Sequence, residues 1–458
     1  MEGFNMKLLK TLALILALTL ILTACGTTDG KEDTTTTGST TEATTTAPEE
    51  TPASDKTEIV LSDELITLNG TAVDSDKEKA VYIAKDIVYY ESGKDFTYGE
   101  GSEKDAHSPE EAEKHTVVHI TKPGTYFVSG KLSYGQLAVD LGEEAEADPE
   151  AVVTLVLDGI DITCEVAPAV IFYNVYECSS ADTETATKDV DTSKAGANVI
   201  LADNSVNTVN GSYVERIYKP DSVVLSADGT EVEDAKKLHK YDAAFYSKMS
   251  MNVGSEEEGT GVLNINAENE GLDSELHLTL NGGNINIFSG NDGINTNEDG
   301  VSVTTVNDGT LKIKVTGETG EGDGIDSNGW LVINGGTVIA EACSFSADAG
   351  IDSDMGIHIN GGTVMATGSM LDRIEDGGQA YATFNLSRKL DGENTLYVKD
   401  SEGNTVKSFK TENAFSVLVF SSADLSDDDT YTLWDAEYQL AEEGDGMGNG
   451  GRPPEPPM

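Results

Sequence analysis

Short runs in which apolar and polar residues alternate recur through the second half of the chain, with Asn and Gly between them. Two of these runs are "LVIN", which starts at Leu331, and "TVIA", which starts at Thr337. Alternation with a period of two, rich in β-branched residues, is typical of short β-strands with one buried face. Within the repeats, no segment has the length and the 3.6-residue period of a helix. The pattern therefore predicts an all-β fold.

The apolar positions also repeat over a longer distance. Corresponding residues lie 22, 26, 27 and 26 positions apart, and they are Leu263, Ile285, Leu311, Val338 and Val364. Self-similarity at this period indicates a solenoid, and three short strands per turn predict a parallel β-helix in which these five side chains stack inward. A calcium β-roll also mixes Gly with Asp, but its nine-residue repeat is about three times too short.

The beginning of the chain has a different pattern. A basic stretch from Met6 to Lys10 precedes an apolar run from Leu12 to Leu22, which is too short for a comfortable membrane span. Small residues then lead into Cys25 as in a lipobox. We predict that Cys25 is lipidated after cleavage and anchors the protein on the outer face of a bacterial cell membrane. The alternative is an ordinary buried apolar helix.

Composition and pattern together divide the chain into six segments. They are a lipoprotein signal at 1–25, a Thr-rich disordered stalk at 26–56, an N-terminal β segment at 57–114, the parallel β-helix at 115–370, a C-terminal β-hairpin cap at 371–440 and a disordered tail at 441–458. The stalk has almost no apolar side chains to bury, so we expect it to hold the folded part away from a membrane. Two stretches before residue 241 are predicted to be loop insertions.

Acidic and amide residues fall at matching positions of successive repeats. One column holds Asp273, Asn295, Asp326 and Asp352, and a neighbouring column holds Asp292 and Asp323. Coils of a β-helix lie ~4.7–4.9 Å apart, a distance at which two carboxylates repel by ~3.5 kcal/mol at an effective dielectric near 20. Because Ca²⁺ takes oxygen ligands at ~2.3–2.6 Å, one ion can bridge two coils. We predict calcium sites at these six residues; the alternative is turn-forming residues whose charges face water.

The charge balance excludes one class of partner. The chain has 29 Lys and Arg against 82 Asp and Glu, a net charge of −53, so a nucleic-acid phosphate backbone would be repelled. We expect a monomer. Cys164 and Cys178 either form a disulfide in an oxidising compartment or remain unpaired thiols, and no cysteine spacing indicates a zinc site.

Several segments together resemble a known family. They include "HTVVHITKPGTYFVSGKLSYGQLAVDL" from His115 and "GIDSNGWLVINGGTV" from Gly324. From His115 to Trp434 the chain resembles the secreted clostridial carbohydrate-binding β-helix proteins. The resemblance implies a right-handed parallel β-helix, similar in fold to pectate lyases, with calcium bound by acidic residues of the coils. It also implies binding of plant cell-wall polysaccharides, both cellulose and acidic pectin-type chains. The chain departs from the family pattern in its two insertions and in Asn295, where other coils carry Asp.

Three functions remain open from the sequence. The first is a non-catalytic polysaccharide-binding protein, in which the outward aromatic residues Tyr246 and Trp330 stack on sugar rings. The second is a calcium-dependent polysaccharide lyase, which needs a base such as Arg or Lys beside a metal-bound acid. Only Arg373 and Lys248 lie near the predicted coil acids. The third is a structural or adhesive surface protein without a sugar ligand.

Overall fold

The computed structural model describes residues 56–444. The predicted lipid anchor at Cys25, the stalk up to residue 55 and the tail beyond residue 444 lie outside this range. The described part is almost entirely β-structure, with one four-residue helix, α1 (Pro109–Ala112), and two short 3-10 turns, η1 (Glu143–Ala147) and η2 (Pro220–Ser222). None of its helices is long and apolar enough to cross a membrane. An all-β fold, as the alternation predicts, is confirmed.

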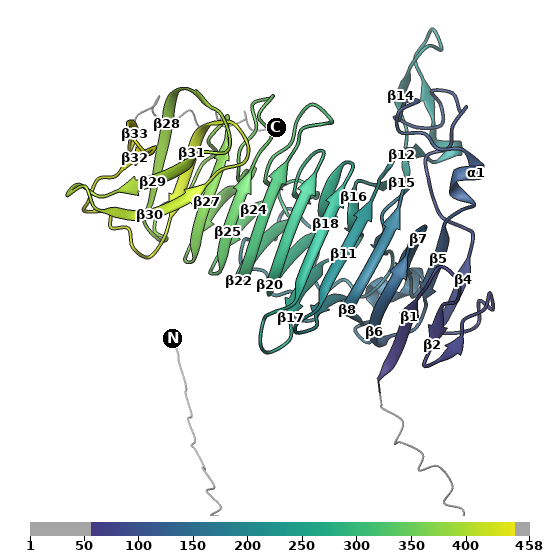
Figure 1. Cartoon of the computed structure of the whole chain (residues 1–458). Coiled ribbons are helices and arrows are strands. Elements are labelled where there is room, and N and C mark those ends of the chain that lie inside the picture. The colour runs from purple at the N-terminus through teal and green to yellow at the C-terminus, as the bar shows by residue number, and fades with distance from the viewer. Residues whose placement is uncertain (1–55, 445–458) are drawn as a thin grey trace, which may run out of the picture. The chain divides into compact units, whose positions relative to one another are not determined.

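Two sheets made mostly of parallel strands form the centre of the fold (Figure 1). The larger, 17-stranded sheet contains β1 (Thr57–Leu61), β2 (Thr67–Leu68), β3 (Thr71–Ala72), β6 (Gly124–Leu132), β8 (Val153–Cys164), β10 (Ala197–Leu201), β11 (Val206–Gly211), β17 (Met251–Ser255), β18 (Val262–Ala267), β20 (His277–Ser289), β22 (Val303–Val315), β24 (Trp330–Ile333), β25 (Thr337–Glu341), β26 (Gly356–Ile359), β27 (Thr363–Gly368), β28 (Tyr381–Leu390) and β31 (Phe415–Ser421). The 8-stranded sheet contains β4 (Val81–Ala84), β5 (Thr116–Ile120), β7 (Gly135–Val139), β9 (Val170–Phe172), β16 (Ala243–Ser247), β19 (Glu270–Ser274), β21 (Ile294–Thr296) and β23 (Ile325–Ser327).

Each turn of the chain adds strands to three parallel strips. The first half of β20 pairs with β17, and its second half pairs with β18, so the larger sheet is two strips joined through its long strands. The smaller sheet forms the third strip, in which β19 pairs with β21 and β21 with β23. Successive turns therefore stack on one another by parallel backbone pairing.

The predicted inward stack is confirmed. Leu263 pairs with Ile285, Ile285 with Leu311, Leu311 with Val338, and Val338 with Val364. Each of these side chains is at most 3% exposed. The residue period of the sequence is therefore the period of the stacked turns, because equivalent residues of successive turns lie side by side.

The motif that begins at Gly324 explains why each residue type recurs. A Cβ at Gly324 would overlap the carbonyl oxygen of Gly350 in the next turn, so only Gly fits there. Ile325 and Ser327 are fully buried, while Asp326 between them is only partly buried and points outward. The Ser327 hydroxyl is 2.8 Å from that of Thr296, so hydroxyls that point inward bond to one another between turns.

Two insertions leave the stacked turns. The first joins β9 to β10 without a strand of its own. The second contains two antiparallel pairs, β12 (Val214–Tyr218) with β15 (Lys237–Tyr241) and β13 (Val224–Leu225) with β14 (Val232–Asp234). Figure 1 shows β12, β14 and β15 rising beside β16. These insertions lie where the sequence predicts them.

Antiparallel strands follow the last parallel turn. β31 pairs antiparallel with β27 and β28, and a separate sheet holds β29 (Thr395–Lys399), β30 (Thr405–Lys410), β32 (Thr432–Trp434) and β33 (Gln439–Glu442). These strands bury an apolar cluster of their own, which includes Phe384, Phe415 and Phe420. The buried Glu341 of β25 accepts the backbone N–H groups of Glu412 and Asn413, each at 2.7 Å, and so ties this part to the parallel turns.

Candidate functional site

The predicted acidic column is present on the outer face of the 8-stranded sheet. Asp273 pairs with Asn295, and Asn295 pairs with Asp326. A parallel bridge one residue earlier places Asp352 next in the same column. The predicted register of these four residues is confirmed, whereas their binding of calcium stays a prediction.

In the neighbouring column, aspartate side chains accept hydrogen bonds from backbone N–H groups of the next turn. The Asp323 N–H donates to Asp292 Oδ1 at 2.6 Å, and Asp323 Oδ1 accepts the N–H of Ala349 at 2.5 Å. Burial, and after it the charge of Asp292, raises the pKa of Asp323 to about 9. Burial also raises the pKa of Asp292. The ionised form of both carboxyl groups is therefore disfavoured unless a cation lies near them.

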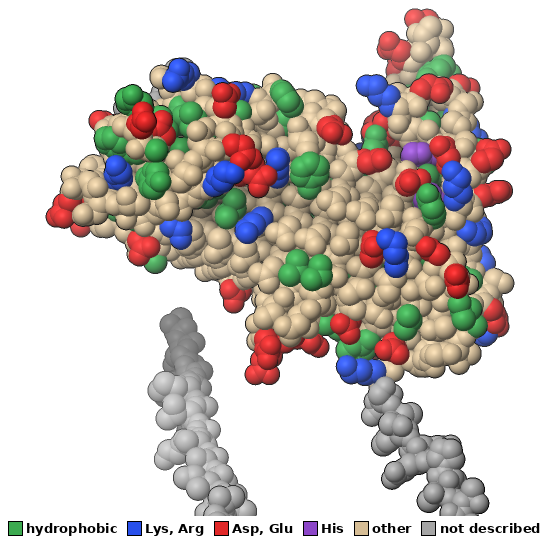
Figure 2. Space-filling view, in the orientation of Figure 1, with side chains coloured by type: hydrophobic (Ala, Val, Ile, Leu, Met, Phe, Trp, Pro, Cys, Tyr) green, Lys and Arg blue, Asp and Glu red, His purple; other side chains and the backbone are tan. Residues whose placement is uncertain are grey.

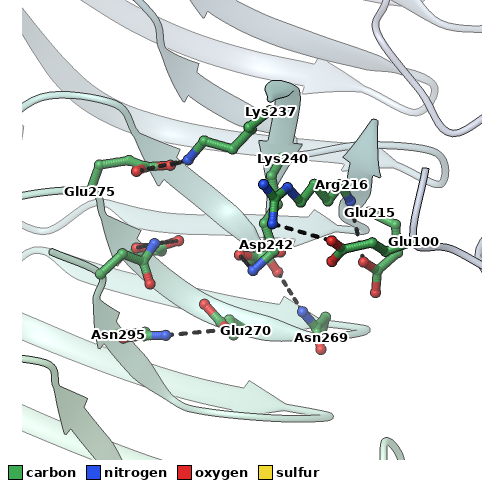
Figure 3. Close-up of polar contacts among 12 residues, drawn as sticks. Glu100, Glu215, Arg216, Lys237, Lys240, Asp242, Asn269, Glu270, Glu275 and Asn295 are labelled. Carbon is green, nitrogen blue, oxygen red and sulfur yellow. Dashed lines mark hydrogen bonds and ion pairs between the residues drawn. The ribbon is translucent and has the colours of Figure 1, made fainter. Parts of the chain in front are cut away.

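Three buried acids meet where the acidic column begins. One carboxylate oxygen from each of Asp242, Glu270 and Asp273 lies within 4.8 Å of the others, and all three residues are buried. We call them the acidic triad. Lys240 Nζ lies 2.7 Å from Asp242 Oδ2 (Figure 3). Although burial acts to lower the pKa of Lys240, the Asp242 carboxylate raises it, so this lysine is a cation.

One lysine does not satisfy the whole triad. Burial is the main cause that raises the pKa of both Glu270 and Asp273. Asn295 Nδ2 donates to Glu270 Oε1 at 3.4 Å, a long bond. Glu270 Oε2 and Asn295 Oδ1 are buried and have no hydrogen-bond partner within residues 56–444. One buried oxygen of the triad and one of the next turn thus lack a donor in the described chain.

Sequence reasoning missed two members of the triad. Glu270 precedes Asp273 by three positions, just as Asp292 precedes Asn295, so the repeat carried a signal for it. Asp242 had no such signal, because it follows directly on β15 of the second insertion, whose path the repeat does not determine.

A groove of about 750 Å³ lies on a different face, over the first strip of the larger sheet. Its base crosses β10, β17, β20, β22 and β24 and ends at Asn360, the residue after β26. Residues 188–193 of the first insertion line its side. Thr192 holds this insertion in place, because its hydroxyl lies 2.7 Å from both Asn252 Oδ1 and Thr279 Oγ1. The groove therefore runs across successive turns.

Four exposed asparagines form a ladder along the groove, which we call the asparagine ladder. Asn307 Nδ2 donates to Asn281 Oδ1 at 2.8 Å, Asn334 to Asn307 at 2.9 Å, and Asn360 to Asn334 at 2.8 Å. A side-chain amide has two N–H donors and an oxygen with two lone pairs. Each internal member of the ladder therefore keeps one N–H and one lone pair for a ligand.

The groove is polar but carries little charge. Only Lys188, Asp189 and Asp191 among its lining residues are charged, and all three lie in the insertion. On the face seen in Figure 2, uncharged polar side chains and backbone likewise cover most of the middle, while many of the acidic side chains lie nearer the periphery. An uncharged surface of amide and hydroxyl groups suits a ligand that is rich in hydroxyl groups, because each group can donate or accept a hydrogen bond.

A protein-family model described as a carbohydrate-binding domain-containing protein matches residues 114–188 and 175–408. The chain belongs to this family. A protein of Acetivibrio thermocellus with the same description is 31% identical over 172 residues, which are 37% of this chain and 44% of that protein, so the match spans less than half of the relative. A solved structure, described as the polysaccharide lyase-like protein from C. thermocellum in a gadolinium derivative, is 18% identical, with a TM-score of 0.38. Its similarity covers 70% of this chain and 94% of that one.

In this family member Tyr246, which the sequence predicts to stack on sugar rings, has no exposed ring face. Tyr246 lies in the outward column, in register with Asp273, but its side chain is fully buried. The Tyr241 ring of β15 covers it at 5.2 Å between centroids, and its hydroxyl donates to Glu275. Trp330, at the start of β24, is partly buried and lies outside the groove lining.

The two residues considered as lyase bases contact groups outside the acidic column. Arg373 Nε pairs with Glu375 at 2.7 Å and its NH2 group donates to the Met355 carbonyl. Lys248 lies 3.9 Å from Glu146 and 3.2 Å from Asn174 Oδ1. Cys164, Cys178 and Cys343 are all free thiols, so the alternative without a disulfide holds.

Proposed function

We propose that this protein is a non-catalytic binding protein for plant cell-wall polysaccharides and that the polymer lies along the asparagine ladder. The observation that carries the proposal is the ladder itself, which presents an unused N–H and lone pair at successive turns. Strands of neighbouring turns lie ~4.7–4.9 Å apart, so a linear polymer placed across them meets a new amide at every step. Membership of a carbohydrate-binding family supports the same class of ligand.

The winding of the chain and its location are parts of this proposal. We infer that the stacked turns form the right-handed parallel β-helix that the resemblance implies, a geometry that provides the long straight face a polymer needs. Lipidation of Cys25 would then hold this face outside the cell, where such polymers occur.

The experiment compares two matched asparagine pairs. Asn307→Ala/Asn334→Ala removes the middle of the ladder. Asn264→Ala/Asn286→Ala removes another bonded asparagine pair, 3.0 Å apart, on the neighbouring strip and outside the groove. Loss of several bonds of about 0.5–1.5 kcal/mol each should weaken binding about tenfold or more for the first variant and leave the second unchanged.

Binding is measured by affinity electrophoresis and pull-down on cellulose, xylan and polygalacturonate. The proposal is wrong if wild-type protein binds none of these polymers. Equal binding of the neutral polymers cellulose and xylan by the wild type and the ladder variant would also contradict it, because the polymer would then lie elsewhere.

We also propose that the acidic triad and the acidic column hold calcium. The residues fit the ion: Ca²⁺ takes six to eight oxygen ligands at about 2.3–2.6 Å, and Glu270 Oε2 and Asn295 Oδ1 are buried oxygens without a donor in the described chain. Asp292, Asp323, Asp326 and Asp352 supply oxygens on the following turns. A bound cation would offset the repulsion between stacked carboxylates, and near Asp242 it would compete with Lys240.

A further inference from the structure

A second cavity, of about 480 Å³, lies on the outer face of the 8-stranded sheet. Its floor crosses several turns, from His119 of β5 to Lys248 beside β16, and residues 237–241 of β15 line the opposite side. It shares no lining residue with the groove that holds the asparagine ladder. Its volume lies within the ~300–1,000 Å³ that is usual for small-molecule sites.

The charge of this cavity differs from that of the rest of the protein. Three lysines line it beside three carboxylates, whereas the whole chain has 29 Lys and Arg against 82 Asp and Glu. Two histidines, His119 and His239, add further donors. Cations are therefore concentrated here in a chain that is otherwise strongly acidic, and an anionic group meets less repulsion here than on most of the surface.

Only one of the three lysines has its charge poorly balanced. Lys237 Nζ lies 2.9 and 3.1 Å from the two Glu275 oxygens (Figure 3), and Lys240 pairs with Asp242. The nearest carboxylate oxygen to Lys248 is that of Glu146, at 3.9 Å, beyond a hydrogen bond. An ammonium has three N–H donors, and Lys248 gives one to the neutral Asn174 at 3.2 Å. Lys248 therefore has donors and charge for a ligand.

Aromatic rings line the same cavity as Lys248. Tyr173 and Tyr241 pack edge to face at 5.5 Å between centroids, and both line the cavity. The Tyr241 hydroxyl is 2.7 Å from His239 Nδ1, which fixes the position of its ring. Tyr241 is only 5% exposed, so the partly exposed Tyr173 is the ring that offers apolar area with a polar edge. This combination matches the C–H face and the hydroxyl groups of a sugar ring.

We propose that this cavity binds a carboxylate-bearing sugar, with its carboxylate on Lys248 and its ring against Tyr173, which Tyr241 holds in place from behind. The site is additional to the groove: a protein cation holds the acid directly, without a bridging metal. It would recognise a single acidic residue or the end of an acidic chain, since the cavity accommodates a small ligand rather than a length of polymer. The proposal does not depend on binding at the asparagine ladder.

The test is isothermal titration with trigalacturonate and with its fully methyl-esterified form. Wild-type protein should bind the acid at least about tenfold more tightly than the ester, because the ester cannot form the charge-assisted bond to Lys248. Lys248→Gln should lose about as much affinity for the acid, while Lys248→Arg, which keeps the charge, should retain most of it. Lys312→Gln, on the exposed side of β22 and outside both cavities, is the matched control and should bind as wild type does.

The Asn307→Ala/Asn334→Ala variant separates this site from the groove. It should bind trigalacturonate normally even though it loses neutral polymers. Equal affinity of wild-type protein for the acid and the ester, or unchanged binding by Lys248→Gln, would overturn the proposal. So would loss of trigalacturonate binding in the ladder variant alone, because the acid would then occupy the groove.

Discussion

Without calcium, the acidic column should make this protein less stable as the pH rises from about 4 to about 7. Burial, followed by the charges of neighbouring aspartates, raises the pKa of Asp326 from 3.8 to about 6 and that of Asp352 to about 7. The folded protein then binds more protons than the unfolded chain over this range, so the free energy of unfolding falls with rising pH. At about 1.36 kcal/mol per pH unit, Asp326 alone accounts for ~3 kcal/mol.

Calcium should reverse this loss. An ion that binds the folded state only adds ~2.7 kcal/mol when its concentration is a hundred times its Kd. In Asp326→Asn/Asp352→Asn the repulsion is removed together with two negative charges that would attract the ion, although each Asn keeps one oxygen ligand. This variant should therefore be more stable than the wild type near pH 7 in EGTA, and it should gain much less from calcium. The reversal of the order of stability is the distinguishing result.

The assay is denaturant unfolding followed by circular dichroism at about pH 4 and about pH 7, with calcium in excess or with EGTA. Asp158→Asn, an exposed aspartate on β8 away from the column, is the matched control and should behave as the wild type does. Equal unfolding free energies with calcium and with EGTA in the wild type near pH 7 would refute the metal hypothesis. A flat pH profile in EGTA would refute the electrostatic reasoning itself.

Three further outcomes are expected. Leu311→Ala should lower the free energy of unfolding by ~2–5 kcal/mol, because it leaves a cavity in the inward stack; a loss below about 1 kcal/mol in denaturant unfolding would mean that the turns collapse around it. Glu341→Ala removes two charge-assisted bonds, to the backbone N–H groups of Glu412 and Asn413, each of which stabilises the fold by ~1.5–3 kcal/mol. The chain after β27 should therefore become more susceptible to limited proteolysis. An unchanged digestion pattern would contradict the role of Glu341. Cys25→Ala should abolish processing and membrane association, as measured by cell fractionation. If the variant stays in the membrane fraction, the predicted lipidation of Cys25 is wrong.

The sequence predicts the stacked turns well because the same buried and exposed positions recur in every turn. A strand places alternate side chains on opposite faces, and a fixed repeat length brings equivalent residues together. The sequence alone therefore assigns Leu311 and Val338 to one stack, and Asn295 and Asp326 to one outward column. The hairpin of β29 and β30 was equally predictable, since its alternating strands enclose a turn.

The sites were harder to predict because they depend on segments outside the period. Tyr246 does face outward from its strand, as predicted, but the repeat says nothing of what lies over it, and β15 covers it with Tyr241. Asp242 enters the triad from the same insertion. The asparagines of the ladder are among the Asn and Gly residues between the alternating runs, and sequence spacing alone does not distinguish a buried amide from an exposed one.

Because the asparagine ladder follows the axis along which the turns stack, the length of this surface is set by a simple count of repeats. Duplication of one repeat of 26 residues, the distance from Asn334 to Asn360, would extend the row by one amide, ~4.8 Å, without altering the chemistry of the others. Deletion of a repeat would shorten it by the same amount. The number of amides in the ladder therefore changes with gene length alone, while every rung keeps the hydrogen-bonding pattern of its neighbours.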